Sequence, residues 1–231
     1  MESYLKNKNI LVLGAHSDDE VLGLGGMILS AKKLGSKVTV LIATDSVSEQ
    51  YANVKQKLIE RDDAFKSCCE ALGVDNFSRL SFPDMKLDSI LHVNLNKAIS
   101  KFISDQDFDT VFVHHPYDIN LDHRLLFESI LVVARPTPNQ KIKSIITYYT
   151  PSSTEWNAID SNRIFVPNMF LDIEGVIDEK ISAILKYESE IKNYPHPRSV
   201  ENIKNMAAYF GSQVGLKLAE PFKLIRHVHS K

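Results

Sequence analysis

Short runs of branched apolar residues alternate along this chain with longer segments of helical periodicity, and this alternation limits the possible folds more than any other feature. Buried strands are predicted at NILVLGA (9–15), KVTVLIAT (37–44), RLSF (79–82), TVFVHH (110–115) and IKSIITYY (142–149). Helices are predicted at 20–35, 51–72, 88–104 and 121–134, where apolar residues recur on one helix face. Strands that alternate with helices predict an α/β fold with a mostly parallel sheet and helices on both faces.

The last third of the chain is less regular. RIFVPNMFLDI (163–173) is predicted to be extended, a helix is predicted at about 175–193, and another at about 199–210 after the segment YPHPRS (194–199). No repeat, low-complexity tract or linker separates these segments from the rest. We therefore predict a single domain over 1–231, with an α/β core at 1–150 and a helix-and-loop extension at 151–231.

Composition limits the partners and the compartment. The 231 residues are 44% hydrophobic and 24% charged, with a net charge of −2, so no basic surface predicts a nucleic-acid partner. Cys68 and Cys69 are adjacent and have no other cysteine to pair with, which fits a reducing compartment. The polar N-terminus and the lack of a long apolar run predict a cytoplasmic protein without a transmembrane segment. A homo-oligomer is left open.

Polar side chains cluster directly after two of the predicted strands. AHSDDE (15–20) follows the first strand, and HHPYDINLDHR (114–124) contains the end of the fourth strand and the residues after it. Ligands of open α/β sheets bind just beyond the carboxyl ends of the strands. If these two strands are neighbours in the sheet, the two clusters meet at one site.

The residue types of the two clusters suit a metal ion. His16 and Asp19 are three apart at a strand-to-helix turn, and His123 is the leading candidate for a third ligand. Such a donor set suits zinc, although iron, cobalt or manganese can also occupy it, and three protein ligands leave a position open for water. Asp18 is then the candidate general base, and Asp122 can orient a ligand histidine.

Simpler explanations stay open for each cluster. Acids at 18–20 can cap a helix N-terminus, and His123 can be a structural histidine. His114 and His115 either contact the site or are polar strand ends. The stretch GLGG (23–26) resembles part of a dinucleotide fingerprint, but it lies inside the predicted helix, where no pyrophosphate would bind.

Both clusters resemble known motifs. AHSDDE is similar to the A-H-P-D-D-E motif of the PIG-L (LmbE-like) family of zinc-dependent N-deacetylases, and NLDHR (120–124) is similar to its second motif, H-P-D-H. The resemblance covers about 8–150 and implies a Rossmann-like fold, with the C-terminal extension completing the rim of the active site. It implies one zinc ion on His16, Asp19 and His123, with Asp18 as the base.

Two positions depart from the family motifs. Ser17 replaces the usual proline, which we expect to be harmless. Asn120 stands where the family has a histidine that assists in the transition state; Asn120 can donate a hydrogen bond but cannot transfer a proton. His196, between two prolines in YPHPRS, is the candidate to replace that histidine as acid or oxyanion donor; a surface loop is the alternative.

Three further residues are candidates for contact with the substrate. Arg61 interrupts the apolar stripe of the helix at 51–72, and Asp84 follows the third strand; both resemble residues that hold sugar hydroxyls in the family. A structural ion pair or a turn is the alternative for each. Trp156 either stacks on a sugar or belongs to the core.

The resulting prediction is an enzyme that hydrolyses a linear amide. It removes the N-acetyl group of an N-acetylglucosamine-type sugar or conjugate through attack of a zinc-bound water, with Asp18 as base and with Asn120 or His196 stabilising the oxyanion. Asp18 or His196 protonates the leaving amine. The alternatives are a metal-dependent amidase or deacylase for a non-sugar or thiol-conjugate substrate, and a non-catalytic module that binds a nucleotide sugar.

Overall fold

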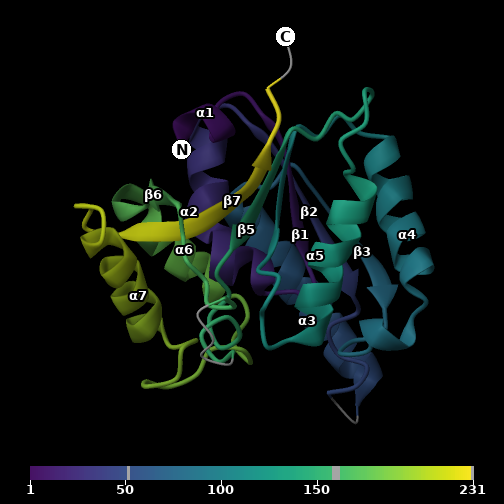
Figure 1. Cartoon of the computed structure of the whole chain (residues 1–231). Coiled ribbons are helices and arrows are strands. Elements are labelled where there is room, and N and C mark those ends of the chain that lie inside the picture. The colour runs from purple at the N-terminus through teal and green to yellow at the C-terminus, as the bar shows by residue number, and fades with distance from the viewer. Residues whose placement is uncertain (51–52, 158–161, 230–231) are drawn as a thin grey trace.

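A computed structural model describes residues 1–50, 53–157 and 162–229, and within them the strands form one mixed sheet of seven strands in the order β3-β2-β1-β4-β5-β7-β6 (Figure 1). The strands are β1 (Asn9–Gly14), β2 (Lys37–Thr44), β3 (Asn76–Phe82), β4 (Thr110–His114), β5 (Ser144–Tyr148), β6 (Met169–Asp172) and β7 (Ala219–His227). Strands β1 to β5 are parallel, β7 is antiparallel to β5, and β6 is antiparallel to β7. The predicted α/β class with a mostly parallel sheet is confirmed.

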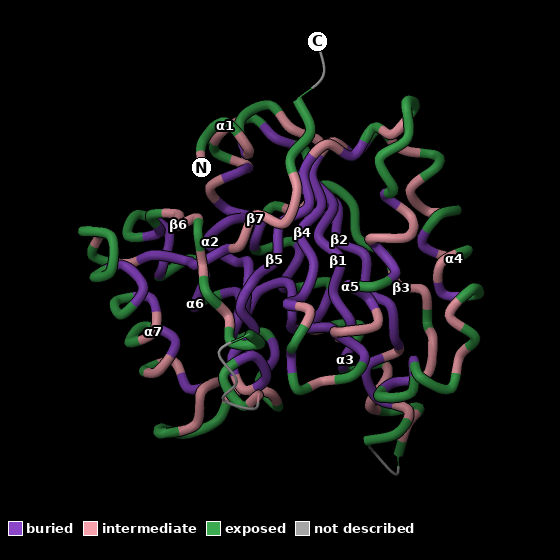
Figure 2. Tube along the Cα trace, viewed as in Figure 1, coloured by how far each residue is buried: buried purple, intermediate pink, exposed green. Residues whose placement is uncertain are grey.

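Helices cover both faces of this sheet. They are α1 (Glu2–Leu5), α2 (Asp19–Lys33), α3 (Val54–Leu72), α4 (His92–Ser104), α5 (Leu121–Val133), α6 (Ile177–Ile184) and α7 (Val200–Ser212), with the short 3₁₀ turns η1 (Leu87–Ser89) and η2 (Glu174–Val176). Successive side chains of a strand point to opposite faces. Ile10 and Val12 of β1 accordingly share a core with α2, α3, α6 and α7, while Leu11 and Leu13 share one with α4 and α5. Figure 2 shows the buried central strands between these layers.

Several predicted boundaries are wrong. The helix at 88–104 begins at His92, after η1, and the helix at 51–72 begins at Val54, with residues 51 and 52 outside the described residues. The long helix at 175–193 ends at Ile184, and turns follow it. The extension is also not only helix and loop, because β6 and β7 add two strands to the sheet beside β5.

A buried ion pair joins α2 to the C-terminal third of the chain. Lys180 Nζ lies 2.7 Å from Glu220 Oε1, and both side chains are almost fully buried. The lysine donates to the carbonyl of Leu22 at 3.0 Å, and the glutamate accepts from the amides of Gly26 and Met27, both at 2.7 Å. Backbone groups inside a helix normally bond only one another. The Lys180–Glu220 pair therefore binds backbone groups of α2 at Leu22, Gly26 and Met27, away from the ends of the helix.

The GLGG stretch is explained by this packing. A Cβ on Gly26 would lie 2.5 Å from Ile173 Cγ2, and a Cβ on Gly23 would lie 2.4 Å from the ring of Tyr148. These distances are too short for any side chain, so the glycines let α2 approach its neighbours. No helix in the described part of the chain is long and apolar enough to cross a membrane.

Candidate metal centre

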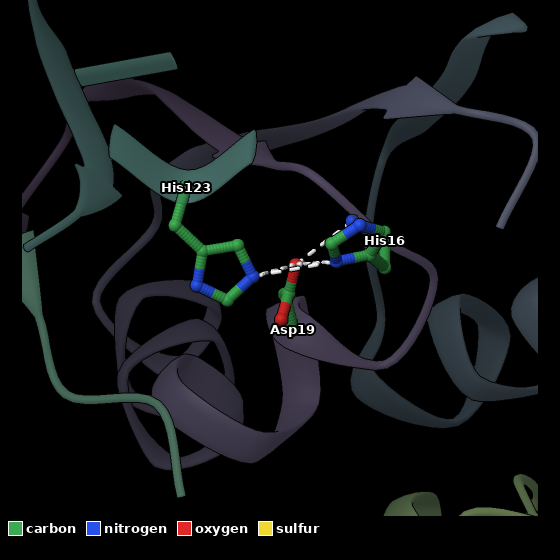
Figure 3. A group of neighbouring side chains, drawn as sticks. All are labelled: His16, Asp19 and His123. Atoms are coloured by element: carbon green, nitrogen blue, oxygen red, sulfur yellow. Dashed lines mark hydrogen bonds and ion pairs between the residues drawn. The ribbon is translucent and has the colours of Figure 1, made fainter. Parts of the chain in front are cut away.

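The two polar clusters meet because β1 and β4 are neighbours in the sheet. His16 lies on the loop after β1, Asp19 is the first residue of α2, and His123 lies in the first turn of α5. His123 Nε2 is 3.3 Å from His16 Nδ1, and Asp19 Oδ2 is 3.6 Å from each of these two nitrogens (Figure 3). Three side chains from separate segments thus point at one spot at the carboxyl edge of the sheet.

This arrangement fits a divalent metal ion. His16, Asp19 and His123 each offer one ligand atom, and these atoms lie within 4.8 Å of one another. Among the described residues, the other oxygen of Asp19, Oδ1, is buried without a hydrogen-bond partner. Two imidazole nitrogens and one carboxylate oxygen are a donor set that zinc accepts, with a position left open.

A carboxylate stands behind each histidine of the triad. Asp122 Oδ2 lies 3.3 Å from His16 Nε2, and Asp118 Oδ2 lies 3.2 Å from His123 Nδ1. Such carboxylates fix the tautomer and orientation of metal-binding histidines. Asp19 Oδ2 accepts from the amides of Ala15 at 3.1 Å and His16 at 2.8 Å. Backbone and side chains together hold the triad in place.

The carboxylates make the site attractive to a cation. Burial alone would lower the pKa of His16, but hydrogen bonds to Asp122 and Asp19 raise it to about 10. Burial likewise opposes ionisation of Asp19 and Asp118, yet His123 and His114 hold the pKa of Asp19 well below its usual range, and His123 holds that of Asp118 at about 2. The acids are therefore ionised, and they favour positive charge between them.

Asp18, which directly precedes Asp19, has an unusual backbone conformation. Its φ is 138°, a region that residues with a side chain rarely adopt, and its side chain is buried. Burial raises the pKa of Asp18 to about 6, although the Arg198 guanidinium acts in the opposite direction. Arg198 Nη1 donates to Asp18 Oδ2 at 2.8 Å. A carboxylate with a pKa near neutrality is suited to exchange protons.

Glu20 holds the backbone of Asp18. Its Oε2 accepts from the Asp18 amide at 3.0 Å, and its Oε1 accepts from the Tyr187 hydroxyl at 2.6 Å. Burial raises the pKa of Glu20 to about 7. Within the described residues, the side chain of Asp18 makes no capping hydrogen bond to α2, so capping does not account for Asp18, whereas Asp19 and Glu20 do lie in the first turn of the helix.

Arg61 and Asp84 both lie close to the first motif. Arg61 is buried, donates through Nη1 to the Ser17 carbonyl at 3.1 Å, and forms an ion pair with Glu190. Asp84 Oδ1 lies 3.5 Å from His16 Nε2, and its Oδ2 accepts from Gln50 at 2.7 Å. Their contact with a sugar stays a prediction.

Ser17 makes contacts that proline could not. Its amide donates to Ser46 Oγ at 2.8 Å, and its hydroxyl accepts from Arg79 Nη2 at 2.6 Å. Proline has neither the N–H nor the hydroxyl. The serine is thus part of the hydrogen-bonded support of the first motif.

Asn120 and His196 have structural partners of their own. Asn120 is the N-cap of α5: its Oδ1 accepts from the Asp122 amide at 2.9 Å, and its Nδ2 lies 3.5 Å from Met85 Sδ. His196 Nδ1 accepts from the Arg198 amide at 3.1 Å, and its ring packs edge-on against Trp156, with 5.6 Å between centroids. Trp156 is 51% exposed, which excludes the core alternative for it.

The two histidines at the end of β4 have different neighbours. His114 stacks on His123 with 3.6 Å between ring centroids and lies 3.2 Å from Asp19 Oδ2, so it contacts the site. His115 Nε2 lies 3.1 Å from the Arg163 carbonyl oxygen. His114 therefore contacts the candidate site, whereas His115 contacts the backbone at Arg163.

Comparison with known proteins identifies the family of this chain. The sequence model of the PIG-L family, described as GlcNAc-PI de-N-acetylase, matches residues 11–134, which is more than half of the chain. This chain belongs to the PIG-L family. As such it is a deacetylase, with the LmbE-like α/β fold.

Individual relatives extend the PIG-L similarity over almost the whole chain. A diacetylchitobiose deacetylase from Thermococcus kodakarensis is 26% identical over 228 residues, which cover 94% of this chain and 83% of that protein. The structure of N,N'-diacetylchitobiose deacetylase from Pyrococcus horikoshii matches with a TM-score of 0.77 at 22% identity, covering 95% of this chain and 84% of that one. The 4-carboxy-2-hydroxymuconate hydratase GalB from Pseudomonas putida has the same fold, with a TM-score of 0.74 at 19% identity and coverage of 97% and 98%. The fold alone therefore does not decide the reaction.

Sequence reasoning missed three residues around the PIG-L motif. Tyr187, Glu190 and Arg198 all come from the segment after α6, and they contact Glu20, Arg61 and Asp18, respectively. The sequence of YPHPRS (194–199) predicted a role in the reaction for His196 and none for Arg198. Two residues further on, Arg198 is the one that hydrogen-bonds Asp18.

Proposed function

We propose that this PIG-L deacetylase hydrolyses the N-acetyl group of an amino sugar related to N-acetylglucosamine, with zinc on His16, Asp19 and His123. The observation that carries the proposal is the triad of two histidines and one aspartate, with a further buried carboxylate at Asp18, which is adjacent to Asp19 in the sequence. The names of the family and of the diacetylchitobiose deacetylases support an N-acetylated sugar as substrate.

The metal and the protein have separate tasks in this reaction. A divalent cation at the triad supplies a Lewis acid that polarises the amide carbonyl and makes water a better nucleophile at neutral pH. Asp18 takes the proton from the attacking water as the general base. The C–N bond then breaks, acetate keeps the oxygen of the water, and the leaving amine takes a proton from Asp18 or from His196.

Two donors are proposed to stabilise negative charge on the carbonyl oxygen. Asn120, three residues before His123, has an amide that can donate a hydrogen bond, and His196 lies on the loop that carries Arg198. Arg61 and Asp84 are proposed to hold sugar hydroxyls, since both contact the backbone or side chains of the first motif. Trp156, which is half exposed, offers a ring face on which a sugar can stack.

A screen for acetate release tests the proposal. The protein is freed of metal with a chelator, reloaded with zinc, and incubated with N-acetylglucosamine, diacetylchitobiose, and N-acetylated nucleotide sugars and thiol conjugates. We expect acetate and a free amine from an amino-sugar substrate with the zinc-loaded protein, and loss of activity in the chelated protein. Release only from a non-sugar amide would support the amidase alternative. No release from any substrate, or release that the chelator leaves unchanged, would contradict the proposal.

A further inference from the structure

A series of ion pairs and hydrogen bonds connects the side chain of Asp18 to the backbone of the preceding residue, Ser17. Arg198 Nη1 bonds Asp18 Oδ2 at 2.8 Å and Glu190 Oε2 at 3.0 Å. Glu190 Oε1 forms an ion pair with Arg61 Nη2, and Arg61 Nη1 donates to the Ser17 carbonyl at 3.1 Å. The series therefore begins at the side chain of Asp18 and ends at the backbone of Ser17.

These charges alternate in sign and are largely shielded from water. The order is Asp18, Arg198, Glu190 and Arg61, so each charge faces an opposite one. The side chains of Asp18 and Arg61 are 5% and 7% exposed, and those of Glu190 and Arg198 are 13% and 20% exposed. The Coulomb attraction between opposite charges is stronger where water is excluded, and breaking one partner of such a pair leaves the other charge buried without compensation. The four side chains hold one another in fixed positions.

Arg198 itself is fixed from several sides. Its Nε donates to Ser152 Oγ at 2.7 Å, and its backbone amide donates to His196 Nδ1 at 3.1 Å. A guanidinium with this many partners cannot turn without breaking several hydrogen bonds at once. Among the described residues, it is the group that hydrogen-bonds the Asp18 carboxylate, and it does so at Oδ2. That leaves the second carboxylate oxygen of Asp18 for the proton.

We propose that Arg198 is a positioning residue that sets the orientation of the Asp18 carboxylate for proton transfer, with Glu190 as the brace that holds Arg198. Asp18 needs such a support because its own backbone is in a rarely adopted conformation, with φ at 138°. The inference rests on the proposed function, because it assumes that Asp18 exchanges a proton with the reactants. It adds that the C-terminal segment supplies part of the proton-transfer apparatus.

Steady-state kinetics of paired variants test this role. We expect Arg198→Gln to lower kcat about a hundredfold, as a misplaced reacting group does, with KM changed by less than about threefold. Arg198→Lys keeps the charge and should recover part of the rate. In an Asp18→Asn background, Arg198→Gln should have no further effect. Arg135→Gln removes an exposed guanidinium whose Nε donates to the Val132 carbonyl, and it should match the wild type.

Two kinetic results would overturn the proposal. If Arg198→Gln left kcat unchanged, the arginine would not act on the reaction. If it lowered the rate of the Asp18→Asn variant as strongly as that of the wild type, it would act on the substrate and not through Asp18.

Crystal structures of the wild type and Arg198→Gln supply a measurement that does not depend on turnover. We expect the Asp18 carboxylate to turn away from its wild-type position, by about 1 Å or more, while His16, Asp19 and His123 stay in place. An unmoved Asp18 carboxylate would overturn the inference. If the zinc-loaded wild type releases no acetate from any substrate, the proposed function fails, and this comparison still decides whether Arg198 positions Asp18.

Discussion

Asp122 is next to His123 in the sequence, yet its carboxylate contacts His16, 106 residues away, at 3.3 Å. The residue that stands behind His123 is Asp118, at 3.2 Å. Asp122 also accepts through Oδ1 from the Leu87 amide at 3.0 Å. One side chain of the second motif thus supports a histidine of the first motif and also ties down the turn after β3.

We expect Asp122→Asn to weaken zinc binding by about 10–100-fold, because the amide carries no charge to hold the His16 ring in its metal-binding orientation. Competition with a chromophoric chelator measures the affinity. Glu128→Gln is the control, since Glu128 is exposed on the same helix. Equal zinc affinity in Asp122→Asn and the wild type would remove Asp122 from the support of the site.

We expect Asp18→Asn to retain zinc while its kcat falls by about 10²–10⁴-fold, because an amide cannot accept a proton at neutral pH. The two measurements are metal content after gel filtration and the rate of acetate release. A variant with full zinc occupancy and a near-wild-type rate would show that another group is the base.

The buried Glu20 makes stability depend on pH. In the folded protein its pKa is raised from 4.5 to about 7 by burial, so between these values the folded state binds more protons than the unfolded state. The free energy of unfolding therefore falls as pH rises through this window, by about 3 kcal/mol in total.

Glu20→Gln should remove this contribution and flatten the pH dependence between about 4.5 and 7. Urea unfolding of the metal-free proteins at several pH values measures the slope. Glu201→Gln, an exposed position on α7, serves as the reference. Parallel curves for wild type and Glu20→Gln would show that Glu20 titrates alike in the folded and unfolded states.

We expect Lys180→Met to lower the free energy of unfolding by about 3–5 kcal/mol, because it leaves the buried Glu220 carboxylate without its cation. Lys33→Met is the matched control: Lys33 pairs with Glu179, but both side chains are more than half exposed, and the cost should stay below about 1 kcal/mol. Both values come from urea unfolding. Equal costs in the two variants would mean that the buried pair contributes no more than a surface pair.

Much of the α/β core was predictable from local sequence, because the pattern of apolar residues in each segment agrees with the place of that segment in the sheet or in a helix layer. The strands at 9–15, 37–44 and 110–115 are apolar on both faces, as strands covered on both sides by helices must be, and the two polar clusters follow strands that are neighbours. The order of elements places His16, Asp19 and His123 at strand ends, but their meeting depended on the condition that β1 and β4 are neighbours, which the structure meets.

The C-terminal third could not be predicted in the same way. Ala219–His227 contains Pro221, Lys223 and Arg226, a composition that does not suggest a strand, yet β7 pairs with both β5 and β6. The helix predicted to run to 193 ends at Ile184, and Tyr187 and Glu190 lie in the turns after it, where they reach Glu20 and Arg61. These are tertiary contacts, which the periodicity of a helix does not predict.

Arg198 was missed for a similar reason. His196 and Arg198 lie two residues apart on one loop, and the hydrogen bond from Arg198 to Asp18 depends on the conformation of that loop and not on the local sequence. The role of His196 in the reaction stays a prediction. Asn120 also has a local role that its position only hinted at, because it caps the helix that carries His123. Its role in the reaction stays a prediction.

The place of β7 in the sheet has a consequence for the synthesis of this protein. Strands β1 to β5 can pair as they leave the ribosome, but β5 keeps an unpaired edge until residues 219–227 have been made. Arg198 and Glu220 are also made late, although they hold residues near the N-terminus. A nascent chain therefore contains His16, Asp19 and His123 before it contains Arg198, so Asp18 can gain its hydrogen bond to Arg198 only after residue 198 has been made.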